Sequence, residues 1–208
     1  MTTRAGLNTI VRNQGIDATT WTDTEVNQFI ADAIGEYNQF FPKVTRTATA
    51  GTACTADVHE YALPADFVSP LLVEFPHGED PPIYLHRLAR TEPRFGAGYY
   101  DIDGANLVIG EDPASTDKYE LTYHAYRDYP DTDATVLEVP DEDLELLCMF
   151  VVWKAYRRLE IDEAKNPTPS SVILTELGSN TGRARFTYER AMTARRTKRP
   201  AGGSVSWG

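Results

Sequence analysis

The segment PDEDLELLCMFVVW, residues 140–153, decides how this chain folds. Nine of its last ten residues are apolar, so a helix built from them would be apolar nearly all round. The proline and the acids that precede them favour a helix start, because the helix dipole attracts negative charge to the first turn. A helix that is apolar on every side is buried on every side. We therefore expect a central helix with other elements packed around it.

Two helices are expected ahead of this segment, each with one apolar face. Thr22 and Glu25 stand at the spacing of a capping box, in which each side chain satisfies a backbone N–H at the helix start. Pro42 ends the second pattern. The apolar residues recur at helical spacing: Leu7, Ile10 and Val11 in the first helix, and Val26, Phe29, Ile30, Ala33, Ile34 and Tyr37 in the second.

Residues 44–139 lack helical periodicity and predict a β-rich insertion. Five prolines between residues 64 and 82 exclude a long helix there. Asp103-Gly104, flanked by β-prone residues, is the strongest short hairpin signal in the chain. Residues 118–126 alternate as a half-exposed strand does. We predict six to eight short strands that form a small sandwich or barrel.

The C-terminal part is predicted as a short helix at 172–177, a break at 178–182, and a last helix at about 183–196. The remaining residues have no helical or strand period, and such a segment cannot offset its own ordering entropy. We expect another chain to order it.

Together these patterns predict an α+β fold. A discontinuous helical body comprises residues 1–43 and 140–195. A β-rich insertion comprises residues 44–139, and an extended basic tail comprises residues 196–208.

Charge is distributed unevenly along the chain. Between residues 57 and 145 there are 21 acidic and 5 basic side chains, whereas between residues 183 and 199 there are 7 basic residues and 1 acid. Such a body repels polyanions, and such a tail fastens to a partner. A solvated acidic surface with a disordered basic end explains the same charges. A nucleic-acid arm is a third interpretation of the tail, although the acidic body opposes it.

The sequence shows no catalytic, cofactor or metal-binding constellation. The two cysteines do not make a disulfide framework, and Cys148 is expected to be a small buried hydrophobe. Residues 101–106 resemble a calcium loop but lack two of its ligands, and a tight turn explains them. Residues 141–143 could bind a cation or merely complement the helix dipole. The four histidines lie apart, without metal-ligand spacing: His59, His77, His86 and His124. We predict no enzyme and no cofactor.

No apolar run approaches the roughly 20 residues of a membrane-spanning helix. No apolar stretch follows Met1 either. We therefore expect a protein made in the cytoplasm, without a membrane partner.

Four segments, in this order, resemble the head–tail connector (adaptor) proteins of tailed bacteriophages. YALPADF at residues 61–67 resembles the start of that family's β-region, and YDIDGANLVI at 100–109 resembles its central hairpin. KYELTYHA at 118–125 is similar to the next strand, and VPD at 139–141 matches the return to the helical body. Residues 166–182 depart from the pattern.

The resemblance implies a virion protein of the neck, assembled in the host cytoplasm. Its subunits would form a ring, typically of twelve copies, below the portal. They would contact their neighbours, the portal and the next neck or tail protein, and DNA would pass through without sequence-specific binding. The portal-binding residues would lie at the C-terminal end, with basic side chains pairing with portal acids and Trp207 as an apolar anchor: Arg195, Arg196, Lys198, Arg199, Val205 and Trp207.

Two alternatives remain open from the sequence. One is a tail-completion or gatekeeper ring of a short-tailed phage, built on similar elements. The other belongs to a different class, a β-sandwich module that binds a ligand such as a carbohydrate through its tyrosine-rich strands.

Overall fold

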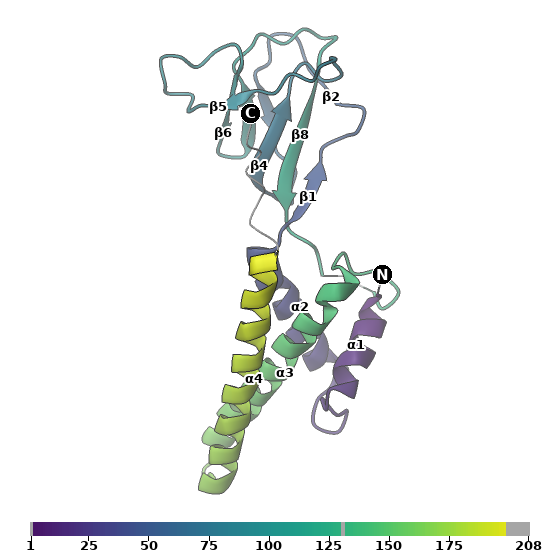
Figure 1. Cartoon of the computed structure of the whole chain (residues 1–208), viewed down its shortest axis with the longest axis vertical. Coiled ribbons are helices and arrows are strands. Elements are labelled where there is room, and N and C mark those ends of the chain that lie inside the picture. The colour runs from purple at the N-terminus through teal and green to yellow at the C-terminus, as the bar shows by residue number, and fades with distance from the viewer. Residues whose placement is uncertain (1, 130–131, 199–208) are drawn as a thin grey trace. The chain divides into compact units, whose positions relative to one another are not determined.

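The computed structural model describes residues 2–129 and 132–198 of the 208-residue chain (Figure 1). The chain divides into a helical unit, residues 1–41 with 127–208, and a β unit, residues 42–126. Helices and strands thus segregate into separate units, and the predicted α+β class is confirmed. Within the described residues, no helix combines the length and the apolar character needed to cross a membrane.

The helical unit contains four α-helices among its described residues. The capping box at Thr22 forms as predicted, since Thr22 Oγ1 accepts from Glu25 N and the Glu25 carboxylate accepts from Thr22 N at 3.0 Å. The predicted acidic first turn is a 3-10 turn that precedes the central helix. The elements are α1 (Arg4–Asn13), α2 (Asp23–Phe40), η1 (Asp141–Asp143), α3 (Leu144–Ala164) and α4 (Ser171–Lys198).

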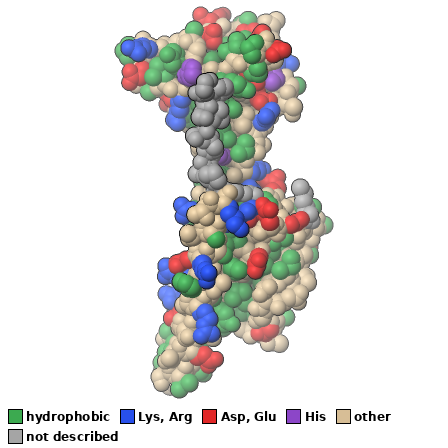
Figure 2. All heavy atoms as spheres, viewed as in Figure 1, with side chains coloured by type: hydrophobic (Ala, Val, Ile, Leu, Met, Phe, Trp, Pro, Cys, Tyr) green, Lys and Arg blue, Asp and Glu red, His purple; other side chains and the backbone are tan. Residues whose placement is uncertain are grey.

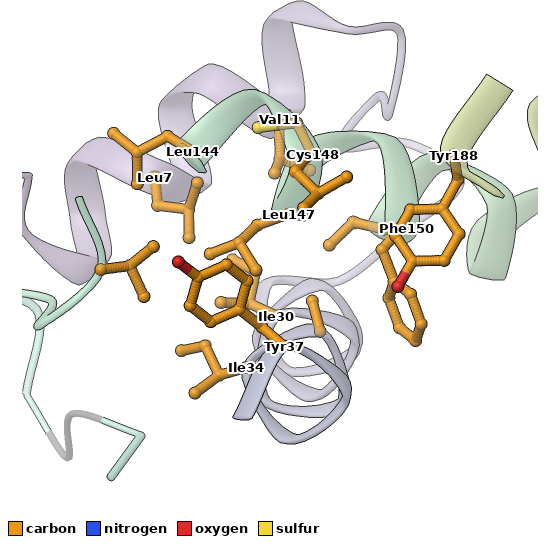
Figure 3. Close-up of a cluster of buried hydrophobic side chains, with 14 of the residues drawn as sticks. Leu7, Val11, Ile30, Ile34, Tyr37, Leu144, Leu147, Cys148, Phe150 and Tyr188 are labelled. Atoms are coloured by element: carbon orange, nitrogen blue, oxygen red, sulfur yellow. The ribbon is translucent and has the colours of Figure 1, made fainter. Parts of the chain in front are cut away.

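Helix α3 is the centre of this unit, as its apolar sequence predicts. Figure 3 shows Leu7 and Val11 of α1 and Ile30, Ile34 and Tyr37 of α2 converging on Leu144 and Leu147, while Tyr188 of α4 meets Phe150. The burial is incomplete on one side, where Met149, Val152 and Tyr156 are only partly covered. The expectation of burial on every side is therefore correct except along this strip.

Helix α4 differs from the prediction, because one continuous helix replaces the short helix, the break and the last helix. Gly178 and Gly182 lie inside it. Each glycine costs about 1 kcal/mol of helix propensity, which packing against α3 offsets. Residues seven apart face α3 on both sides of the glycines, and the buried or half-buried positions Leu174, Thr181, Tyr188 and Arg195 continue this repeat.

The β unit contains eight strands, within the predicted range. Strand β8 is the centre of the first sheet, with β1 and β2 on one side and β4 on the other, all antiparallel to it. The second sheet has the order β3-β7-β6-β5. Both sheets bury side chains in one shared core. The strands are β1 (Lys43–Arg46), β2 (Thr52–Ala53), β3 (Glu60–Ala62), β4 (Phe67–Glu74), β5 (His86–Arg87), β6 (Tyr99–Asp103), β7 (Asn106–Ile109) and β8 (Lys118–Ala125).

Residues 127–139 belong with the helices rather than with the β insertion. Leu137 and Val139 are buried in the helical core, and Leu137 N donates to the Thr2 carbonyl at 2.8 Å. This segment has no helical period, so its sequence alone did not distinguish it from the insertion. Its apolar side chains bind it to the helices.

Candidate interaction surface at the end of helix α4

Arg195 fixes the last turns of α4 to the start of α3. Its Nε lies 2.5 Å from Asp143 Oδ1, and Nη2 donates to Asp143 Oδ2 at 3.2 Å. Glu142 forms a second ion pair with the same guanidinium. These carboxylates hold the pKa of Arg195 above its usual value, although partial burial works against them. Arg195 thus serves the internal packing of the chain.

Asp143 is a buried acid, with 1% of its surface exposed. It accepts a hydrogen bond from Tyr37 Oη at 2.5 Å in addition to its pairing with Arg195. A buried carboxylate is tolerated when it is paired and hydrogen-bonded in this way. The acids predicted as a possible cation site are therefore engaged by protein groups: Thr2 donates to Asp141, while Arg195 binds Glu142 and Asp143.

The other predicted residues separate into two groups. Arg196 lies over the Phe40 ring, with its guanidinium carbon 4.7 Å from the ring centroid, and it remains exposed. Lys198 is the last residue of α4 and is also exposed. Arg199, Val205 and Trp207 lie outside the described residues.

The end of α4 is anchored by aromatic packing as well as by charge. Tyr188 stacks on Trp153, with ring centroids 5.8 Å apart, and meets Phe150 edge-on at 5.3 Å. Burial raises the pKa of the Tyr188 phenol. Figure 2 shows Lys and Arg side chains distributed along α4. The helix is therefore a basic rod, held to the unit along one face and ending in exposed cations.

The residues that the sequence suggested for calcium binding or thiol chemistry have structural roles. Asp101 accepts from Arg90 N at 2.8 Å, and Gly104, with φ of 59°, supports the β6–β7 hairpin turn. Cys148 is buried among apolar side chains, and burial raises its pKa to about 11. Among residues 2–129 and 132–198, no three His, Cys, Asp or Glu side chains gather where they could hold a metal ion.

Sequence reasoning missed the internal partners of Arg195. Its positive charge suggested a docking residue, but Asp143 lies 52 positions earlier in the chain, and no local pattern joins the two. The continuity of α4 could have been recognised, because the seven-residue repeat through Leu174, Thr181 and Tyr188 passes across the glycines.

Comparison with known proteins adds the family. The family described as "SU10 adaptor protein" matches residues 2–204, which is nearly the entire chain. A comparison with curated proteins found no match. The fold agrees with the resemblance seen in the sequence, since the β-region lies between helices in chain order. The chain belongs to the SU10 adaptor protein family, a family of phage head–tail adaptors.

Proposed function

We propose that this phage adaptor forms a ring below the portal, extends the DNA channel and joins the capsid to the next neck or tail protein. Twelve copies is the number that the resemblance to head–tail connectors implies. The protein would act by assembly alone, without catalytic residues or cofactors. The adaptor family supports a structural role in the virion.

The observation that carries the portal contact is the position of the basic residues. Arg196 and Lys198 are exposed on the final turn of a helix that Arg195 and Tyr188 fix to the unit. A rigid base reduces the entropy lost when the following residues bind. In the proposal, Arg196, Lys198 and Arg199 pair with portal acids, and Val205 and Trp207 fill an apolar site. Arg195 supports this end of the helix through its own ion pairs.

The negative charge of the β unit and of the chain as a whole supports passage of DNA without capture. The β unit has 13 acidic and 6 basic side chains between residues 42 and 126, and the chain as a whole has a net charge of −11. Phosphate binding requires clustered basic side chains. An acidic ring would therefore conduct the polyanion without holding it, while many copies of the tail would together strengthen the portal contact.

Co-sedimentation with portal rings from the same phage tests the proposal. We expect the full chain to sediment with portal rings and a chain ending at residue 198 to stay in the supernatant. The Arg196→Gln/Lys198→Gln/Arg199→Gln variant should bind several-fold more weakly, and the difference should shrink at high salt. Arg157→Gln/Arg158→Gln is the matched control, because these exposed arginines pair with acids on α3. Unchanged attachment of the shortened chain would contradict the role of the tail.

The alternative that the β unit binds a carbohydrate is weakened by the positions of four of its tyrosines. Tyr100, Tyr119 and Tyr123 are buried in the core of the β unit, and the Tyr61 ring packs 4.9 Å from that of Tyr119. These rings are occupied in packing the two sheets, so they do not form an exposed face for a carbohydrate. The gatekeeper alternative shares the ring architecture and differs in its neighbours within the virion, which cross-linking in the particle would identify.

A further inference from the structure

A cavity of about 380 Å³ lies in the helical unit where α3 is incompletely covered. Apolar side chains of α3 line it: Cys148, Met149, Val152 and Tyr156. Helix α4 contributes Asn180, Arg183, Ala184 and Thr187, and Gln14, the residue that follows α1, also lines the cavity. An apolar cavity of about 150 Å³ holds a benzene molecule. The cavity is thus large enough for an aromatic side chain.

Phe186 is a large apolar side chain that the fold leaves in solvent. It lies on α4 with 66% of its surface exposed. Arg183 and Arg190 flank it one turn before and one turn after, and Arg183 also lines the cavity of its own chain. No ion pair is recorded for either arginine within the part of the chain that the structure describes. An exposed aromatic ring between arginines is typical of a protein-binding surface.

Phe186 and the cavity lie on different sides of the same helix. At about 100° per residue, Phe186 points roughly 160° away from Ala184 and roughly 100° away from Thr187, which both line the cavity. The ring cannot enter the cavity of its own chain from that position. When two complementary features of one chain face in different directions, each copy can bind the next head to tail, and such a contact gives a ring when the rotation between copies closes.

Charge complements this fit. Glu145 lines the cavity beside Cys148 and is exposed, and it takes part in none of the ion pairs recorded among the described residues. Arg183 of the same chain also lines this cavity, and Arg190 next to an entering Phe186 ring would add a further positive charge near the carboxylate. Opposite charges at the rim of an apolar contact select the correct register and partner.

We propose that Phe186 of one copy inserts into the α1–α3–α4 cavity of a neighbouring copy, with Arg190 beside the neighbour's Glu145. This inference rests on the proposed ring and assigns residues to its contact between subunits. The chain's own residues 199–208 are the competing occupant of the cavity, and the test separates the two.

Disulfide trapping on the full chain tests the contact. One chain carries Phe186→Cys and the other Val152→Cys, both with Cys148→Ala to remove the thiol in the cavity. The two are mixed at high concentration with an added oxidant, which accepts the two electrons and two protons released from each pair of thiols. We expect a disulfide-linked heterodimer several-fold more abundant than with Thr193→Cys in place of Phe186→Cys. Thr193 is exposed on nearly the same face of α4, two turns away, beyond the reach of a disulfide.

Equal trapping by the two cysteine positions would overturn the inference. So would a disulfide within one chain between Val152→Cys and Trp207→Cys, which would assign the cavity to the C-terminal segment. Native mass measurement of the unmodified chain separates a failure of this contact from a failure of the proposed ring. If rings form or portal binding persists without specific trapping, only this contact is wrong. If the chain neither self-associates nor binds portal rings, the proposed function also fails.

Discussion

Arg195 Nε lies 2.5 Å from Asp143 Oδ1, and this ion pair joins the end of α4 to the buried start of α3. Asp143 also receives the Tyr37 hydroxyl from α2. One carboxylate therefore connects three helices. The exposed cations of the proposed portal contact, Arg196 and Lys198, follow Arg195 in the sequence.

Removing the arginine should destabilise the helical unit. We expect Arg195→Leu to lower the free energy of unfolding by about 3 kcal/mol, because a buried carboxylate loses its counter-charge. Arg190→Leu is the control, since Arg190 lies on the exposed face of the same helix. Urea unfolding followed by tryptophan fluorescence measures both, with Trp21 and Trp153 reporting on this unit. An equal effect of the two substitutions would contradict the buried role of Arg195.

Asn38 should be nearly as important to stability. Its Nδ2 donates to the Arg127 carbonyl at 2.9 Å, and its Oδ1 accepts from Arg127 N at 3.1 Å, both in a buried setting. Asn38→Ala leaves two buried backbone groups without this partner, so we expect a loss of about 2 kcal/mol in the same unfolding assay. Gln39→Ala, at the neighbouring exposed position, should change stability by less than about 0.5 kcal/mol.

Asp17 should make stability depend on pH in the acid range. Hydrogen bonds from the Thr19 hydroxyl and the Thr20 backbone and side chain lower the pKa of Asp17 to about 2. A lowered folded-state pKa means that this contribution is complete above the unfolded value near 4 and is lost as the pH falls toward 2. Asp17→Asn should flatten the pH dependence of unfolding between about pH 4 and pH 2. Asp32→Asn is the control, and the pH dependence of its unfolding should stay closer to that of the parent chain.

Two glycines should respond in opposite directions to the same substitution. Gly182 lies inside α4, and a Cβ atom built there meets no atom within 4 Å. Gly182→Ala should therefore stabilise the chain by about 0.5–1 kcal/mol, since alanine favours the helix. Gly15, which follows α1, has a φ of 91°, a backbone conformation that alanine adopts only with strain. Gly15→Ala should therefore destabilise the chain. Thermal melting followed by circular dichroism at 222 nm gives both signs, and a loss of helix with Gly182→Ala would argue against a continuous α4.

Local sequence patterns predicted most of the elements and their type. The Thr22 capping box, the Asp103-Gly104 hairpin and strand β8 depend on neighbouring residues, so their signals lie within a few positions. The predicted half-exposed alternation of β8 is wrong in its first half, because β8 is the central strand of its sheet and buries Tyr119, Glu120 and Leu121 in succession. The portal-binding residues stay a prediction. The structure shows that Arg196 and Lys198 are exposed, whereas Arg195 pairs with Asp143, a contact that no local sequence pattern indicates.

The sequence by itself determined the α+β class and the central position of α3, because a helix that is apolar nearly all round must be enclosed. Only the tertiary structure decided that α4 runs unbroken through Gly178 and Gly182, and that residues 127–139 belong to the helical unit. Both outcomes depend on contacts with distant residues. Burial against α3 outweighs the local preference of glycine. Leu137 becomes buried only when its segment packs into the helical core and its backbone N–H donates to the Thr2 carbonyl, far away in the sequence.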